Sequence, residues 1–326
     1  MERLCSWPSW IVPTTHPPQA AAVRIECWMI RFIVLIALSS FLITPLMGAA
    51  PPPILPLSER VTFLSADGAT MLVGYIFRPQ GPHAERTPAV VMMHGRAGAY
   101  SSAAEGDYSV MTLSRRHQQW GHLWARQGYL AILVDGFGPR GYPQGFPRFS
   151  YFSRPETLNE VTVRPLDAYG ALAWLRKRND VIPDRIALQG WSNGGSAALA
   201  TMASVSAPGI ALLTPVTGFR GALVFYPACG LKDQFDSGLI PYAPVRIFQG
   251  SADEEVSPHY CSELIGRSRA RGGDIQITTY SGATHDFDDP GKERRDVSAN
   301  VAATKDAILH ALAFFASVLN TLAVRK

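Results

Sequence analysis

The stretch Gly190-Trp191-Ser192-Asn193-Gly194-Gly195 joins two segments with different hydrophobic patterns. The apolar run Arg185 to Gln189 before it is typical of a strand, whereas Ser196 to Met202 after it is rich in helix-forming residues. A sharp strand-to-helix turn holds a serine hydroxyl clear of the sheet, and flanking glycines supply the missing Cβ atoms that so tight a turn needs. The sequence therefore predicts a nucleophile elbow with Ser192 at its tip.

The Gly-x-Ser-x-Gly pattern alone is weak, because a chain of 326 residues with 28 glycines can contain it by chance. The fold that uses this elbow also needs an acid and then a histidine later in the chain, each following a strand. Asp253 follows the strand-like run Pro244 to Gln249, and His285 follows the alternating run Asp274 to Tyr280. The order Ser192, Asp253, His285 predicts a catalytic triad.

Several other residues are candidates for these roles. Glu254 and Glu255 adjoin Asp253, but Asp253 stands at the expected distance from the strand end. Asp135 also ends a strand, yet it precedes the serine, and we expect it to shape the following turn. His94 ends a strand as well, and we expect it to position other residues rather than to catalyse.

Two backbone N–H groups are candidates for an oxyanion hole. The N–H of Asn193 lies at the start of the helix that follows the elbow. The fold takes its second donor from the loop after the third strand, where His94-Gly95-Arg96 stands. We assign this donor to Arg96, with Gly95 as the alternative.

Composition indicates a folded, globular chain, with 47% hydrophobic and 17% charged residues. The net charge of +4 comes without a run of Lys or Arg, so no nucleic-acid partner is indicated. The chain has neither a phosphate-binding Gly-rich loop nor the Cys and His spacing of a zinc site, so we expect no cofactor and no metal. We interpret the acidic run His285-Asp286-Phe287-Asp288-Asp289 as a solvated loop.

The first 50 residues are predicted to be a leader, with a secretory signal peptide at 29–50. Arg31 precedes apolar residues, and the small residues Gly48-Ala49-Ala50 close the segment. This pattern predicts a periplasmic or secreted protein, and the alternative is a membrane anchor formed by the same segment. We expect contact with a membrane only through the leader, and a single catalytic domain over 51–326.

Strand-like and helix-like segments alternate along that domain. The expected strands are Val61 to Leu64, Met71 to Phe77, Ala89 to Met93, Tyr129 to Val134, Arg185 to Gln189, Gly221 to Tyr226, Val245 to Gln249 and Ile275 to Tyr280. The expected helices are His117 to Gln127, Pro165 to Lys177, Gly194 to Ala203, His259 to Arg269 and Val297 to Leu322. This alternation predicts an α/β-hydrolase fold, with a mostly parallel eight-stranded sheet flanked by helices and no large cap domain.

From about Val61 to Leu322 the chain resembles the dienelactone hydrolase family of α/β hydrolases. The segments that carry the resemblance are His94 to Gly98, Gly128-Tyr129, Asp135 to Gly141, the elbow, Gly250 to Asp253, and His285 to Phe287. Dienelactone hydrolases proper use a cysteine nucleophile, whereas this elbow holds Ser192. A serine depends fully on His285 for activation, as in carboxylesterases.

The resemblance and the triad together predict an exported serine hydrolase of small esters or lactones that works through an acyl-enzyme. The alternatives are a serine peptidase of the prolyl oligopeptidase type, or a non-catalytic binding module that retains the fold. The aromatic loop Gly136 to Pro155 either walls an apolar pocket or merely covers the sheet. Arg140 in this loop is either a ligand for a substrate carboxylate or a structural ion-pair partner. The oligomeric state is left open.

The cysteines predict one disulfide. Cys5 and Cys27 belong to the leader, so export leaves Cys229 and Cys261 as a pair in an oxidising compartment. Cys229 follows the sixth expected strand, and Cys261 lies in the helix after the seventh. Neighbouring strands would bring both sulfurs to the carboxyl side of the sheet, and the alternative is two unpaired thiols.

Overall fold

The computed structural model of the chain describes residues 58–80, 82–204 and 214–320. The chain divides into two units, Met1–Pro52 and Pro53–Lys326, and every described residue belongs to the second. The predicted leader over 1–50, with its signal peptide at 29–50, lies outside the described residues and stays a prediction.

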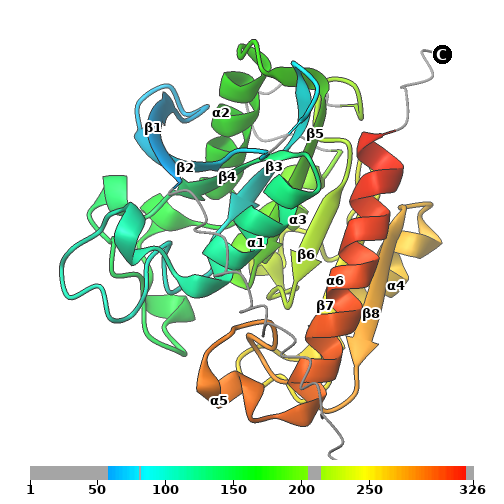
Figure 1. Cartoon of the computed structure of the whole chain (residues 1–326). Helices are drawn as coiled ribbons and strands as arrows, with labels where there is room; N and C mark the ends of the chain where they lie inside the picture. The colour runs from blue at the N-terminus through cyan, green and yellow to red at the C-terminus, as the bar shows by residue number, and fades with distance from the viewer. Residues whose placement is uncertain (1–57, 81, 205–213, 321–326) are drawn as a thin grey trace, which may run out of the picture. The chain divides into compact units, whose positions relative to one another are not determined.

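One eight-stranded sheet runs through the described part of the chain, in the order β1-β2-β4-β3-β5-β6-β7-β8 (Figure 1). The pairs β1/β2 and β2/β4 are antiparallel, and all the other neighbours are parallel. The predicted mostly parallel sheet is therefore present. Its strands are β1 (Glu59–Leu64), β2 (Met71–Phe77), β3 (Thr87–Met93), β4 (Leu130–Asp135), β5 (Val181–Trp191), β6 (Ala222–Phe225), β7 (Val245–Gly250) and β8 (Ile275–Tyr280).

Helices cover both faces of this sheet (Figure 1). Alternate residues of β3 point to opposite faces: Val90 and Met92 belong to a core with α1 (Arg115–Arg126) and α6 (Ser298–Leu319). Val91 and Met93 belong to a second core, shared with the helices of the other face. Those helices are α2 (Arg164–Arg176), α3 (Asn193–Met202) and α4 (Pro258–Ala270), and a short α5 (Lys292–Arg295) precedes α6.

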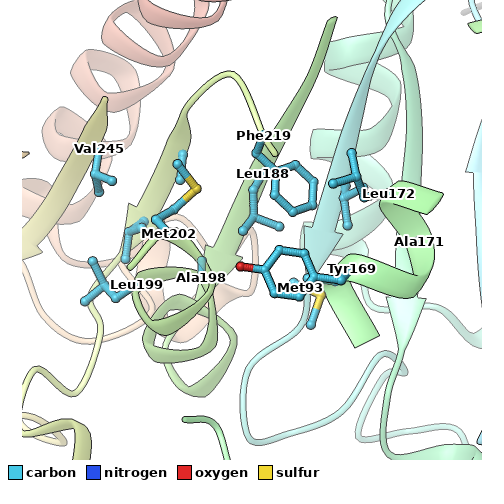
Figure 2. Packing of buried hydrophobic residues seen from close by; sticks show 14 of the residues in the cluster. Met93, Tyr169, Ala171, Leu172, Leu188, Ala198, Leu199, Met202, Phe219 and Val245 are labelled. Carbon is cyan, nitrogen blue, oxygen red and sulfur yellow. The ribbon is translucent and has the colours of Figure 1, made fainter. Parts of the chain in front are cut away.

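The core under α2 and α3 fixes where the functional loops begin. Tyr169 of α2 and Leu199 and Met202 of α3 pack over Leu188 and Met93 of the central strands (Figure 2). Burying a Leu or Met side chain fully is worth about 1.5 to 3 kcal/mol. The first turns of both helices are thereby held at the carboxyl ends of β3 and β5.

Helix α6 has the length and mean hydropathy, 1.4, that a membrane span would need. In this domain, however, one stripe of α6 at a spacing of four residues packs on the sheet. The stripe consists of Ala303, Ala307, Ala311, Phe315 and Leu319. Its three alanines allow α6 to lie close to the strands, so the helix serves the core of this domain.

A disulfide joins Cys229 and Cys261, as the sequence predicts, with an S–S distance of 2.08 Å. Cys229 follows β6, and Cys261 lies in the first turn of α4. The bond therefore ties the segment after β6 to the helix that follows Asp253.

We expect the double variant Cys229→Ser/Cys261→Ser to unfold more easily by about 3 to 4 kcal/mol, because the bond closes a loop of 32 residues. Denaturant unfolding of both proteins measures the difference. Peptide mapping without reduction should yield the two cysteines as one linked pair. Alkylation of both thiols in the unreduced protein would show that no bond forms.

Candidate active site

Three predicted residues meet at the carboxyl edge of the sheet. The Nε2 atom of His285 lies 3.0 Å from the Oγ atom of Ser192. Its Nδ1 atom lies 2.9 Å from Oδ2 and 3.1 Å from Oδ1 of Asp253. The side chains of His285 and Asp253 are 1% and 0% exposed. The structure thus brings together a hydroxyl, an imidazole and a carboxylate in one hydrogen-bonded chain, as the sequence predicts.

The elbow holds Ser192 in an uncommon backbone conformation, with φ 50° and ψ −117°. Such a conformation costs about 1 to 3 kcal/mol and persists only where its surroundings impose it. A Cβ atom on Gly190 would lie 2.2 Å from the carbonyl oxygen of Gly194, and one on Gly194 would lie 2.2 Å from that of Met93. Both glycines are therefore required by close backbone contacts.

The acid hydrogen-bonded to the imidazole of His285 is Asp253, not the adjacent Glu254. The Oδ1 atom of Asp253 accepts hydrogen bonds from the backbone N–H groups of Glu255 and Val256, each at 2.9 Å. Glu254 instead accepts the backbone N–H of His285 at 2.9 Å. Glu254 therefore holds the backbone of His285. It does not take the place of Asp253 beside the imidazole.

The loop after β3 packs directly on the elbow. A Cβ atom on Gly95 would lie 3.4 Å from the Cβ atom of Ser192. Arg96 and Asn193 line the same pocket as Ser192. Both segments predicted to supply oxyanion donors therefore border the serine, and the roles of their N–H groups belong to the proposal below.

His94 and Asp135 lie in the interior, where they hold backbone turns. The Nδ1 atom of His94 lies 2.7 Å from the carbonyl oxygen of Gly95, and its Nε2 atom accepts the N–H of Gly136 at 3.3 Å. Asp135 accepts the N–H groups of Phe137 and Gly138 at 3.1 and 2.8 Å. These contacts agree with the positioning roles expected for both residues.

A pocket of about 610 Å³ opens over Ser192. Phe149, Tyr151 and Phe152 from the aromatic loop line it, and the first and last of these are 75% and 97% exposed. Phe137 of the same loop is buried against the His94 ring, with ring centroids 4.5 Å apart. The later aromatic residues of the loop thus line the pocket, whereas Phe137 at its start is buried against His94.

Arg140 lies outside that pocket lining and pairs with Asp167. Its two terminal nitrogens each lie 2.8 Å from one of the carboxylate oxygens. This bidentate pair ties the loop after β4 to α2. Arg140 is therefore the structural ion-pair partner that was one of the two expectations.

The model of the dienelactone hydrolase family matches residues 72–319, which include every site residue described above. The chain belongs to the dienelactone hydrolase family. It is therefore a hydrolase of this family, and the resemblance inferred from the sequence is confirmed.

Solved structures agree with this fold. An esterase of the planctomycete Thermogutta terrifontis, Est2, is 20% identical, with a TM-score of 0.55 over 84% of this chain and 97% of that one. A dienelactone hydrolase-like promiscuous phosphotriesterase from metagenomic libraries, P91, is 17% identical, with a TM-score of 0.57 over 80% of this chain and 98% of that one. The α/β-hydrolase fold predicted from the sequence is confirmed.

Glu255 adds a second carboxylate near His285 in this member of the dienelactone hydrolase family. Its two oxygens accept hydrogen bonds from Nε and Nη2 of Arg96, both at 2.6 Å. One of those oxygens lies 3.8 Å from the Nε2 atom of His285. The side chain of Arg96 is therefore committed to an acid of the site, a contact that the sequence does not predict.

The carboxylates around His285 change its proton affinity. Burial alone lowers the pKa of the imidazole, but the hydrogen bond to Asp253 and the charges of Asp286 and Glu255 outweigh burial and raise the pKa above its usual value. The cationic imidazole that forms when a serine is deprotonated is therefore stabilised in this site.

The acidic run after His285 is not the solvated loop expected from the sequence. The side chain of Asp288 is 0% exposed, and that of Asp286 is 21% exposed. Arg116 of α1 pairs with Asp286 and donates to the hydroxyl of Tyr226 at 2.8 Å, while Tyr226 donates to Asp288. Trp120 and Trp191 donate their indole N–H groups to Asp288. Donors from distant parts of the chain thus replace the expected water.

Among the described residues, Glu255, His285 and Asp286 form a group whose ligand atoms lie within 4.8 Å of one another, as a metal site would require. Arg96 and Arg116 already pair with the two carboxylates. His285 is bonded to Ser192 and Asp253. These hydrogen bonds and ion pairs already involve the carboxylate oxygens and imidazole nitrogens that would serve as metal ligands.

Proposed function

We propose that the protein is a serine hydrolase of small carboxylic esters or lactones that acts through an acyl-enzyme. The observation that carries this proposal is the 3.0 Å contact between Ser192 and a histidine whose other nitrogen is bound by Asp253. Ser192 attacks the ester carbonyl while His285 takes the hydroxyl proton, and Asp253 stabilises the resulting imidazolium. The N–H groups of Asn193 and Arg96 bind the oxyanion.

The second half of the reaction uses the same groups. The tetrahedral intermediate collapses, the C–O bond to the alcohol breaks, and His285 returns its proton to the departing oxygen. A water molecule, deprotonated by His285, then attacks the acyl carbonyl. As the bond between the acyl carbon and Oγ of Ser192 breaks, His285 returns the proton to Oγ, and the acid leaves. In this scheme the apolar part of the ester contacts Phe149, Tyr151 and Phe152, which line the pocket.

The solved relatives support this substrate class. Est2 is described with propionate bound, and also phosphorylated by paraoxon. A small carboxylate and an organophosphate both suit a site in which an activated serine meets an acyl or phosphoryl centre. We therefore propose short-chain esters first and lactones second.

A panel of p-nitrophenyl esters of increasing acyl length, lactones and peptide anilides tests the proposal. We expect kcat/KM to be highest for short-chain esters. Activity only on peptide anilides would favour the peptidase of the prolyl oligopeptidase type. A purified, folded protein with no turnover of any panel member would favour the non-catalytic binding module.

We propose further that the protein is exported and works in the periplasm or outside the cell. The apolar segment after Arg31 supports this, and so does a disulfide, which persists in oxidising compartments. N-terminal sequencing of protein from cell fractions tests the proposal. An intact leader in the membrane fraction would favour the anchored form instead.

The pH dependence of kcat/KM should report the raised pKa of His285. Only the neutral imidazole accepts the proton of Ser192, so activity rises as pH passes the pKa. Nearby carboxylates stabilise the charged form, so this rise should lie above the ordinary histidine value of about 6.5. Glu255→Gln removes one carboxylate and leaves the charge of Arg96 without its partner. Both changes lower the pKa of His285, so the rise of kcat/KM in this variant should move to lower pH.

The exposed pair between Glu263 and Arg267 supplies the control, and Glu263→Gln should leave the profile unchanged. A pH–rate profile of the three proteins measures both shifts. A rise in Glu255→Gln that moves to higher pH would contradict the electrostatic account of His285.

A further inference from the structure

One buried arginine links the two segments that border Ser192. Arg164, the first residue of α2, is fully buried. Its Nη1 atom donates to the carbonyl oxygen of His94 at 2.9 Å and to Oδ1 of Asn193 at 2.6 Å. A single nitrogen thus donates hydrogen bonds both to the start of the loop after β3 and to the side chain of Asn193 in the elbow.

Each of these two contacts lies next to a proposed oxyanion donor. Asn193 supplies one N–H itself, and its side chain is also held by Glu160, which accepts from its Nδ2 atom at 3.2 Å. His94 stands two residues before Arg96, whose N–H is the other proposed donor. The two segments touch closely, since a Cβ atom on Gly194 would lie 2.4 Å from the carbonyl oxygen of His94.

The side chain of His94 continues the same restraint along the backbone. Because Gly136 donates to its Nε2 atom, the Nδ1 atom carries the hydrogen and donates to the carbonyl oxygen of Gly95. Gly98 donates to that oxygen as well, at 3.2 Å. The Gly95 carbonyl and the Arg96 N–H belong to one peptide group, in which they point in opposite directions when it is trans. These hydrogen bonds to the Gly95 carbonyl therefore direct the N–H of Arg96 away from the imidazole of His94.

Arg164 keeps this position despite incomplete hydrogen bonding. Its Nε and Nη2 atoms are buried and have no hydrogen-bond partner among the described residues. Its guanidinium carbon lies 4.9 Å from the centroid of the Phe137 ring. Burial lowers the pKa of Arg164 to about 10, so the group still carries its charge at neutral pH. Buried donors without partners destabilise a fold, which points to a requirement in the site.

We propose that Arg164 is a positioning residue that sets the spacing between the N–H groups of Asn193 and Arg96. The inference rests on the proposed function, because it assumes that these groups bind an oxyanion. Arg164 is absent from the pocket lining, so it acts through the two backbone segments. Without it, each segment keeps its other contacts but loses the shared one.

We expect Arg164→Met to lower kcat by about 100-fold, the loss typical of one oxyanion donor, with KM changed less than about threefold. The decisive readout is the ratio of kcat/KM for an ester to that for its thionoester analogue. Sulfur accepts hydrogen bonds more weakly than oxygen, so a well-placed oxyanion hole favours the ester. Displaced donors should reduce this ratio, and a ratio does not depend on the fraction of folded enzyme.

Two further variants complete the test. Asn193→Ala removes the second acceptor of Arg164 while the guanidinium and the backbone N–H of residue 193 stay in place, and it should reduce the same ratio even if Arg164→Met folds poorly. The matched control is Arg176→Met, at the other end of α2, where the guanidinium bonds the carbonyl oxygens of Pro183 and Gly218. That variant should lose stability and keep the ratio of the unaltered protein.

The outcomes are separable. No ester turnover by the unaltered protein would refute the proposed function itself. Turnover with a clear preference for the ester that persists in both Arg164→Met and Asn193→Ala would overturn the role of Arg164 alone. An equal fall of the ratio in Arg176→Met would show a general effect of helix α2, and would also overturn it.

Discussion

Ser192→Ala should lower kcat for the best ester by at least about 10⁴-fold, because the serine, the histidine and the acid act as one unit. His285→Ala should be similar and Asp253→Asn somewhat milder. The proposed oxyanion donors remain in place, so a small residual rate above water is expected. Steady-state kinetics of the folded variants and of the unaltered protein measure the loss of kcat.

The matched control is Ser262→Ala on the exposed face of α4, which should leave kcat unchanged. Circular dichroism should show Ser192→Ala folded like the unaltered protein, since only a hydroxyl is removed. If Ser192→Ala kept more than about a tenth of the turnover on every ester, Ser192 would not be the nucleophile.

Arg116→Met should destabilise the fold by about 3 to 5 kcal/mol, the range found when one partner of a buried ion pair is removed. Arg116 compensates Asp286, and its Nη1 atom also lies 3.8 Å from Asp288. A methionine of similar volume leaves both carboxylates without that charge. The loss is a large share of the stability of a typical domain.

Arg115→Met on the exposed side of the same turn is the control and should change stability by less than about 0.5 kcal/mol. Denaturant unfolding of both variants gives the difference directly. Equal stability of the two variants would mean that the acidic run is solvated after all, as the sequence alone indicates.

The features that could be predicted from the sequence are those with a local pattern. Strands β2 and β8 have the predicted bounds, because each alternates or is apolar over its full length. The elbow follows from its glycines, and the partners of Ser192 follow from strand ends. Strand β5 begins at Val181, earlier than expected, because pairing with Thr87 extends it past Pro183.

The remaining features of the site depend on residues far apart in the chain. Arg96 and Glu255 are separated by 159 residues, and Arg116 and Asp286 by 170. Arg164 reaches across 70 residues to His94. A charged residue in such a pair is indistinguishable in sequence from a solvated one, because nothing in the local pattern indicates its partner.

The central claim is that Ser192 forms a covalent intermediate, and one measurement tests it most directly. The protein is treated with paraoxon, digested and analysed by peptide mass spectrometry, with Ser192→Ala beside it. Attack by the serine on phosphorus releases p-nitrophenolate and leaves a diethylphosphoryl group on the oxygen. We predict one adduct, on the peptide that contains Ser192, and none in the variant. An unmodified Ser192, or equal modification of both proteins at another residue, would contradict the account.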